Sequence, residues 1–182
     1  MDGVGRRVAF IRGINVGRGR KVPMAELRAG LADIGFGNVR TYIQSGNVVY
    51  DGAADAADST AALRAEGRAI TGVIGTISGI EPLAMVFTVA AVAGHLAASP
   101  YGAADPAQAV VVFVDGDPDR LGDLTAYATA GEELRIIDGV IHVHCPNGLG
   151  TSKVAAKLAA STKVPTTTRN LRTIAKVLEL AG

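Results

Sequence analysis

The sequence has no tryptophan, one cysteine and few aromatic residues of any kind. Aromatic side chains make up 4% of the 182 residues, which argues against a large platform for stacking single-stranded bases. The single cysteine, Cys145, rules out an internal disulfide framework and fits a reducing cytoplasm. The first apolar run, 8–11, ends after four residues at Arg12, so we expect no secretory signal peptide.

Long hydrophobic runs are also missing. The longest apolar region, 82–99, contains Gly94 and His95 and divides at Thr88, which predicts a strand and then a helix instead of a membrane span. Hydrophobic residues make up 48% of the chain and charged residues 19%, which is typical of soluble globular proteins. A chain of 182 residues can bury the core of one domain or of two small ones.

The net charge of +1 conceals an uneven distribution. Residues 1–40 carry eight Lys or Arg, residues 150–182 carry six, and the middle of the chain holds 13 of the 17 acidic residues. If the two basic ends meet in space, one face of the protein is positive. The alternative is that these charges are solvated and have no functional role.

The first half of the chain has the pattern βαββαβ. An apolar run, a helix opened by Pro23, a hairpin centred on Ser45-Gly46 and a second helix follow one another. The predicted strands are 8–11, 40–43, 47–50 and 83–87, and the predicted helices are 23–34 and 59–74. Thr88 then suits the N-cap of a further helix.

The second half repeats this pattern after a linker at 100–106. Asp138-Gly139 is the strongest short turn signal in the chain and predicts a second hairpin. The predicted strands are 109–114, 133–137, 140–144 and 164–168, and the predicted helices are 117–128, 151–160 and 170–180. We therefore predict an α+β protein with two ferredoxin-like (α/β plait) halves, 1–100 and 101–182, with antiparallel sheets and a closing C-terminal helix.

The first candidate site is the loop 13–21, which follows an apolar strand and precedes a helix. It contains three glycines that permit close approach of a ligand, and it is rich in Arg and Lys. Anion sites use this order of strand, glycine-rich loop and helix. The spacing matches neither a P-loop nor a dinucleotide fingerprint, so a flexible surface loop is the alternative.

Two further candidates lie near the C-terminus. The stretch 147–153 offers free backbone N–H groups, two hydroxyls and Lys153 at a helix start, where a plain capped helix is the alternative. In 166–172, Arg169 and Arg172 lie near a helix N-terminus, where the helix dipole disfavours cations. A bound anion would relieve that conflict, and so would ion pairs with acidic residues from the middle of the chain.

Other polar residues permit weaker hypotheses. His142 and His144 share one face of a strand, but without an evident third ligand they are expected to be structural, and no metal site is predicted. Cys145 is expected to be unreactive because no catalytic partner is identifiable. The residues around the first hairpin turn can be ligand contacts or simple turn formers: Tyr42, Gln44, Ser45 and Asn47.

Three segments carry a resemblance to a known family. They read VAFIRGINVGRGRKVPMAELR, VRTYIQSGNVVY and, near the C-terminus, NGLGTSKV followed by VPTTTRNLRTIAKVLEL. Over Arg6 to Leu180 the chain resembles the bacterial domain-of-unknown-function 1697 family, although 52–140 matches only in general pattern. The sequence departs from the family pattern at Leu171, where Trp is frequent, and at Val154, where Leu is common.

The resemblance implies a small soluble cytoplasmic protein with two α/β plait halves and no established activity. Its signature positions in this chain would be Arg12, Gly13, Asn15, Gly17, Lys21, Pro23, Gln44, Ser45, Gly46, Asn47, Gly148, Ser152, Lys153, Thr168, Arg169 and Asn170.

The leading hypothesis is that the protein binds an anionic, phosphate-bearing ligand between its two halves, such as a phosphorylated small molecule or a nucleotide. The expected ligand-binding residues are Arg12, Gly13, Asn15, Gly17, Lys21, Gln44, Ser45, Asn47, Gly148, Ser152, Lys153, Arg169 and Asn170. The alternatives are a structural or protein-interaction module without a ligand, a weak nucleic-acid binder through the basic ends, and an enzyme at the same site. No pattern supplies a general base, so the sequence specifies no catalytic residue and no cofactor. It specifies no oligomeric state, and no membrane partner is expected.

Overall fold

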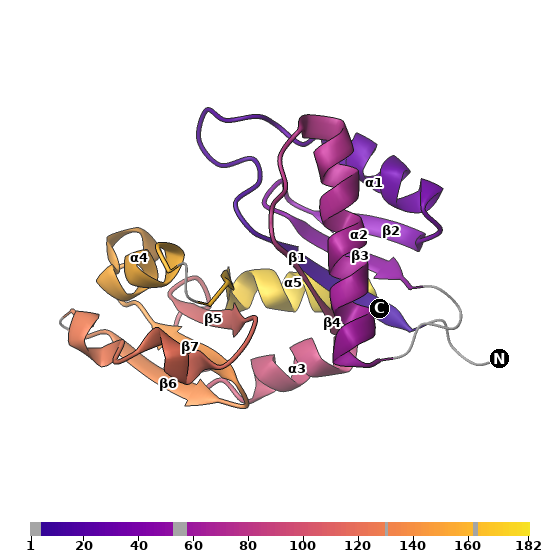
Figure 1. The fold of residues 1–182 in the computed structure, drawn as a ribbon. Coiled ribbons are helices and arrows are strands. Elements are labelled where there is room, and N and C mark those ends of the chain that lie inside the picture. Colours follow the sequence, from indigo (N-terminus) through magenta and orange to yellow (C-terminus); the bar gives the residue numbers. More distant parts are fainter. Residues whose placement is uncertain (1–4, 53–57, 130, 162–163) are drawn as a thin grey trace. The chain divides into compact units, whose positions relative to one another are not determined.

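The computed structural model describes residues 5–52, 58–129, 131–161 and 164–182, and the chain forms two compact units. Unit 1 consists of Met1–Val92 together with Lys176–Gly182, and unit 2 consists of Ala93–Ala175. Two helices, α3 (Val89–Ala97) and α5 (Leu171–Ala181), contribute residues to both units. The elements are labelled in Figure 1.

Unit 1 contains a four-stranded antiparallel sheet in the order β2-β3-β1-β4. Its strands are β1 (Arg6–Ile11), β2 (Gly37–Tyr42), β3 (Asn47–Asp51) and β4 (Ala84–Thr88), and its crossover helices are α1 (Met24–Asp33) and α2 (Thr60–Ser78). The element order βαββαβ with this strand order confirms the ferredoxin-like prediction for the first half.

The core of unit 1 lies between this sheet and α1 and α2, which Figure 1 shows beside each other. Leu27, Leu31, Ile70 and Ile74 of the helices are fully buried against inward-facing strand residues such as Ile11. Gly67 allows α2 to lie directly on β4, because a Cβ at this position would come within 2.4 Å of the Ala84 carbonyl oxygen. A glycine that weakens the helix in isolation therefore permits its packing.

Unit 2 repeats the same sheet topology, with the strand order β6-β7-β5-β8 and antiparallel pairing throughout. Its strands are β5 (Ala109–Val114), β6 (Glu133–Ile137), β7 (Val140–His144) and β8 (Thr166–Asn170), and its second crossover helix is α4 (Lys153–Ala159). Val154 and Leu158 of α4 pack on strand residues that include Val112 and Ile141. The predicted second ferredoxin-like half is thereby confirmed.

The first crossover of unit 2 is not the helix predicted over 117–128. Two short 3-10 helices stand in its place, η1 (Pro118–Leu121) and η2 (Thr125–Tyr127). Gly122, at φ +78°, ends η1. The Asp123 carboxylate then accepts hydrogen bonds from the backbone N–H and the hydroxyl of Thr125, which fixes a turn instead of continuing the helix.

The helix α4 and the strand β8 each begin two residues later than predicted. The helix predicted over 151–160 starts at Lys153, because the Ser152 hydroxyl accepts the Ala155 N–H at 3.0 Å and caps it. The strand predicted over 164–168 runs instead from Thr166 to Asn170. The Asn170 side chain then accepts the Thr173 N–H at 2.8 Å and starts α5.

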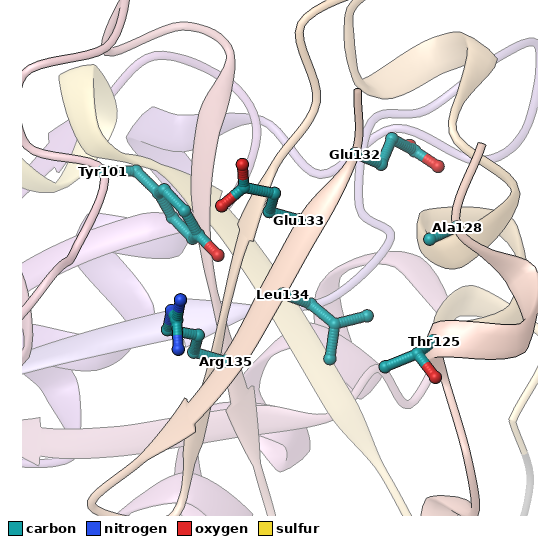
Figure 2. A pocket seen from close by; sticks show the side chains of 7 residues that line it. All are labelled: Tyr101, Thr125, Ala128, Glu132, Glu133, Leu134 and Arg135. Carbon is teal, nitrogen blue, oxygen red and sulfur yellow. The ribbon is translucent and has the colours of Figure 1, made fainter. Parts of the chain in front are cut away.

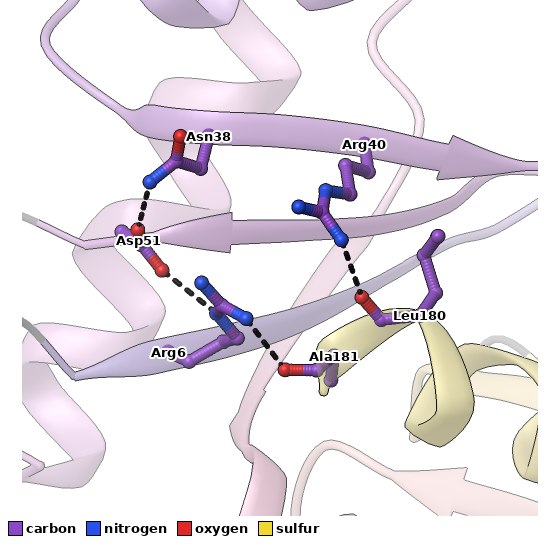
Figure 3. Close-up of polar contacts among 6 residues, drawn as sticks. All are labelled: Arg6, Asn38, Arg40, Asp51, Leu180 and Ala181. Atoms are coloured by element: carbon purple, nitrogen blue, oxygen red, sulfur yellow. Dashed lines mark hydrogen bonds and ion pairs between the residues drawn. The ribbon is translucent and has the colours of Figure 1, made fainter.

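Two arginines anchor the C-terminal end of α5 to the sheet of unit 1 (Figure 3). Arg6 donates to the Ala181 carbonyl oxygen at 2.6 Å and Arg40 donates to that of Leu180 at 3.3 Å. Both carbonyls belong to the last turn of α5. The carbonyl groups of a last turn have no hydrogen-bond donor within the helix, and they form the negative end of the helix dipole. Asp51 orients Arg6 through an ion pair of 2.8 Å, and that pair lowers the pKa of Asp51.

No helix in the described part of the chain is both long enough and apolar enough to span a membrane.

A buried charge cluster lies on the helix-covered face of the unit 1 sheet. Arg7 of β1 is 1% exposed, and its Nε lies 3.6 Å from a carboxylate oxygen of Glu66 in α2. The other Glu66 oxygen accepts the hydroxyl proton of Tyr50, whose ring stacks on Phe36. Burial, together with the hydrogen bond to Glu66, raises the pKa of Tyr50, so the phenol stays protonated.

We expect Arg7→Met to lower the free energy of unfolding by about 3 kcal/mol, because it leaves the Glu66 carboxylate buried without its cation. Urea denaturation of Arg7→Met, Glu66→Gln and the double variant measures the coupling. The double variant should cost less than the sum of the two single changes. Additive costs would show that Arg7 and Glu66 do not stabilise each other.

Candidate functional site

Asn15 determines the shape of the N-terminal glycine-rich loop. Its side-chain amide donates to the carbonyl oxygens of Val22 (3.0 Å) and Gln44 (2.9 Å), and its oxygen accepts the Val22 N–H at 2.8 Å. Its φ of +57° is one that asparagine tolerates better than most residues. Asn15 therefore joins the two ends of the loop to each other and to the first hairpin.

The basic side chains of this loop also contact backbone carbonyls. Lys21 Nζ lies 2.9 Å from the Gly17 oxygen within the same loop. Arg20 donates to the carbonyl oxygens of Ser78 (3.1 Å) and Gly79 (3.4 Å), at the C-terminal end of α2. Arg18 is exposed, and Arg12 is half-buried. The predicted cations of the loop are thus present at the surface, but Arg20 and Lys21 also stabilise the fold.

The first hairpin turn lies beside this loop and is held by Asn47. Asn47 is fully buried, and its amide donates to the Tyr42 carbonyl and to the Ser45 hydroxyl, both at 3.1 Å. Gly46 packs tightly on β1, because a Cβ there would lie 2.7 Å from the Ile11 carbonyl oxygen. Gln44 is exposed. The structure brings the loop 13–21 and the first hairpin turn together in unit 1, where Asn15 and Asn47 stabilise the backbone of both.

Asn15→Ala should lower the free energy of unfolding by about 2 kcal/mol, because three hydrogen bonds are lost and alanine is strained at positive φ. The matched control is Gln44→Ala, which removes an exposed side chain and keeps the backbone acceptor. Thermal unfolding of both proteins checks this. Equal melting temperatures for the two variants would contradict the bracing role of Asn15.

The two predicted segments near the C-terminus, 147–153 and 166–172, both contribute to one pocket of unit 2, which has a volume of about 360 Å³. We call it the α4 pocket. Its lining combines an alanine face of α4 with residues of the preceding turn and of β8: Leu149, Gly150, Ser152, Ala155, Ala156, Ala159 and Thr168. Lys153 follows Ser152 and is exposed, and Arg169 follows Thr168 and is half-buried. Lys153 therefore adjoins a largely apolar pocket in the chain. Alternation along β8 directs Arg169 to the sheet face that carries Thr167, which is opposite to the face of Thr168.

Arg169 is partly desolvated at this position. Its guanidinium donates to the Thr167 hydroxyl at 3.0 Å and to the Thr168 carbonyl oxygen at 2.8 Å, both neutral groups. Burial lowers the pKa of Arg169 to about 10, so the side chain is still a cation at neutral pH. Arg172 instead forms an ion pair of 3.4 Å with Asp105, which is the alternative considered for these arginines from the sequence.

Ser152 also belongs to a buried polar cluster that the sequence did not reveal. Glu132 accepts from the N–H and the hydroxyl of Thr129, at 2.8 and 2.9 Å. Burial alone would raise the pKa of Glu132, but hydrogen bonds from Ser152 and Thr129 outweigh it and lower the pKa. Burial raises the pKa of the nearby Cys145 thiol. Only the short spacing of Thr129 and Glu132 could have indicated part of this cluster.

The two strand histidines, His142 and His144, have different surroundings. Among the described residues, no three His, Cys, Asp or Glu side chains are grouped closely enough to hold one ion. His144 stacks on Tyr101 with 5.6 Å between ring centroids. His142 is fully buried, and neither of its ring nitrogens has a hydrogen-bond partner among the described residues. Burial, and next His95, lower the pKa of His142, whereas Asp138 opposes this effect.

We expect the free energy of unfolding to fall as the pH decreases below the ordinary histidine pKa of 6.5. The unfolded chain binds a proton near that pH, whereas folded His142 binds it only at lower pH, so acid favours the unfolded state. The stabilisation is complete above 6.5.

Urea denaturation between about pH 7.5 and pH 5 measures this slope for the wild type and for His142→Leu. The variant should show a shallower slope, with a residual part from the half-buried His95. An unchanged slope would place the acid sensitivity elsewhere.

A second cavity of unit 2, of about 500 Å³, lies along β6. We call it the β6 cavity. Its lining residues are Tyr101, Thr125, Ala128, Glu132, Glu133, Leu134 and Arg135. Figure 2 shows Tyr101, Glu133 and Arg135 on one side of the strand and Leu134 with Thr125 on the other. No pattern in the sequence predicts this cavity.

A family model described as "Protein of unknown function (DUF1697)" matches residues 4–142. The chain belongs to the DUF1697 family. The match includes the N-terminal loop and the first hairpin, whereas the turn and helix that line the α4 pocket follow its last residue. The family description gives no activity, and no curated protein matches the chain.

The DUF1697 fold is also seen in a solved structure. The chain is similar to the conserved bacterial protein SP0830 from Streptococcus pneumoniae, with 22% sequence identity and a TM-score of 0.76. The alignment covers 98% of this chain and 99% of that one, so it extends through the α4 pocket and α5. At this identity the similarity establishes the fold alone.

Proposed function

We propose that this DUF1697 protein binds a small anionic ligand, one that carries a phosphate group, at the α4 pocket. The observation that supports this proposal is that Leu149, Gly150 and Ser152 of the predicted segment 147–153 and Thr168 of the predicted segment 166–172 line a single pocket of unit 2. Both segments were expected to bind an anion, each for its own reason. Their meeting is what neither segment predicts alone.

The composition of the α4 pocket fits an amphiphilic small molecule. The side chains of Ala155, Ala156 and Ala159 form an apolar floor, and the hydroxyl-bearing Ser152 and Thr168 lie at its border. A volume of about 360 Å³ falls within the range of small-molecule sites. A phosphorylated metabolite or a nucleotide would place its apolar part on the alanines and its phosphate near Lys153.

Lys153 supplies the positive charge in this proposal. Lys153 is exposed and follows Ser152 of the pocket, and its flexible side chain carries a compact ammonium group that can contact a phosphate at the pocket. Arg169 belongs to the opposite face of β8, together with Thr167, and is not part of this site.

The proposed function is binding without a reaction. The Ser152 hydroxyl is used to cap α4, and burial keeps the Cys145 thiol protonated, so neither is prepared to act as a nucleophile. The loop of unit 1 from Arg12 to Lys21 was also expected to bind the ligand. The hydrogen bonds of Asn15, Arg20 and Lys21 instead favour a structural role for this loop.

The test is a thermal-shift screen of the full chain against inorganic phosphate, pyrophosphate, nucleotides, sugar phosphates and short RNA. A ligand at one hundred times its dissociation constant adds about 2.7 kcal/mol of stability. Ala156→Leu should abolish the shift by filling the pocket, and Lys153→Ala should weaken it at least about tenfold.

The matched controls are Ala160→Leu and Arg120→Ala, which change exposed residues of unit 2 that do not line the pocket. Both should retain the wild-type shift. A shift that survives in Ala156→Leu but disappears in Arg12→Ala would move the site to unit 1. No shift with any compound would favour the structural reading.

A further inference from the structure

The outer edge of β6 presents backbone groups that no neighbouring strand satisfies. β6 is the last strand of its sheet, and β7 occupies its other edge. The β6–β7 hairpin closes through a two-residue turn in which Asp138 and Gly139 have φ of +49° and +77°, so Ile137 and Val140 exchange hydrogen bonds. Alternation then directs the N–H and C=O groups of Leu134 and Ile136 outward.

An independent hydrogen bond supports this assignment. The Cys145 N–H donates to the Gln108 carbonyl oxygen at 2.8 Å, which directs residues 141, 143 and 145 toward β5 and residues 140, 142 and 144 toward β6. Among the backbone hydrogen bonds described outside the sheet ladders, none involves Leu134 or Ile136. The β6 cavity is lined by Glu133, Leu134 and Arg135 of this strand.

β6 is a short edge strand with two charged residues, but it lacks a bulge, which is another feature by which proteins protect an edge. The edge strand of unit 1, β2, has a register shift between Gly37 and Arg40, and such irregularities discourage strand addition. The ladder of β6 is regular from Glu133 to Ile137 and contains no proline or lysine. Ile136 is 46% exposed. This edge is therefore open to a further strand.

We propose that two copies of this chain associate through antiparallel pairing of their β6 strands, centred on Leu134. Glu133 and Arg135 lie on the same face of the strand, two residues apart. Pairing about Leu134 places Glu133 of each copy directly opposite Arg135 of the other. Opposite charges in such cross-strand positions attract, and the two-fold symmetry makes the contact twice.

The charges also select this register over its neighbours. Pairing centred on Arg135 would put two guanidinium groups opposite each other, which is repulsive. Pairing centred on Ile136 would place Leu134 opposite Asp138 and leave Glu133 without a cation. The Leu134 register pairs the outward N–H and C=O groups of Leu134 in both copies and also satisfies the charges of the strand. It places Ile136 opposite Glu132, whose carbonyl oxygen can accept the Ile136 N–H, while the Glu132 N–H already donates to Thr129 at 2.9 Å.

The test measures self-association by sedimentation velocity at about 1 µM to 1 mM, because an interface of two short strands is small and weak. The wild type should show a monomer–dimer equilibrium. Glu133→Arg and Arg135→Glu should each weaken it by at least about tenfold, because like charges then face each other. An equimolar mixture of the two variants should restore association, since the opposed charges are again complementary.

A second pair of variants tests the backbone hydrogen bonds. Ile136→Pro removes an outward N–H that the β6–β7 ladder does not use, and Ile136→Thr keeps that N–H and a β-branched side chain. Circular dichroism establishes that both are folded, and only Ile136→Pro should lose association. A wild type that is monomeric throughout, a mixture that fails to associate, or equal association of both Ile136 variants would overturn the proposal.

Discussion

The burial of one central strand in each unit is the constraint on which the rest of the structure depends. β1 and β5 are each paired at both edges, and Val8, Ala9, Phe10 and Ile11 of β1 are fully buried. A strand enclosed in this way can hardly carry a charged side chain without partners, and Arg7 forms ion pairs with Asp58 at 2.8 Å and with Glu66 at 3.6 Å. The polar residues that could contact a ligand therefore lie beyond the ends of the strands, in the glycine-rich loop and in the turn before α4.

Three of the eight basic residues in 1–40 serve the fold. Arg6, Arg20 and Arg40 donate to carbonyl oxygens at the C-terminal ends of helices. These carbonyls need donors and favour positive charge, and an arginine meets both requirements. For these three arginines a nucleic-acid interface is not needed to account for the charge.

The sequence predicted those features that depend on local pattern. The hairpin 133–137 and 140–144 was found with its bounds, because alternating apolar residues and Asp138-Gly139 act within a few positions. The helix over 117–128 was wrong, because the turn at Gly122 and Asp123 competes with helical periodicity. The α4 pocket and the Glu132 cluster could not be predicted, since they join residues that meet only in the folded unit. Asn15 was recognised as important, but its role as a brace needed the positions of Val22 and Gln44.

The most direct test of the central claim is a two-dimensional NMR titration of 15N-labelled protein with inorganic pyrophosphate. The claim is that the unit 1 loop is a braced structural element and that the α4 pocket binds the anion. It predicts saturable chemical-shift changes at Gly150, Ser152, Lys153 and Thr168, with little change from Gly13 to Lys21. Changes concentrated in that loop, or no saturable change at the α4 pocket, would contradict the account.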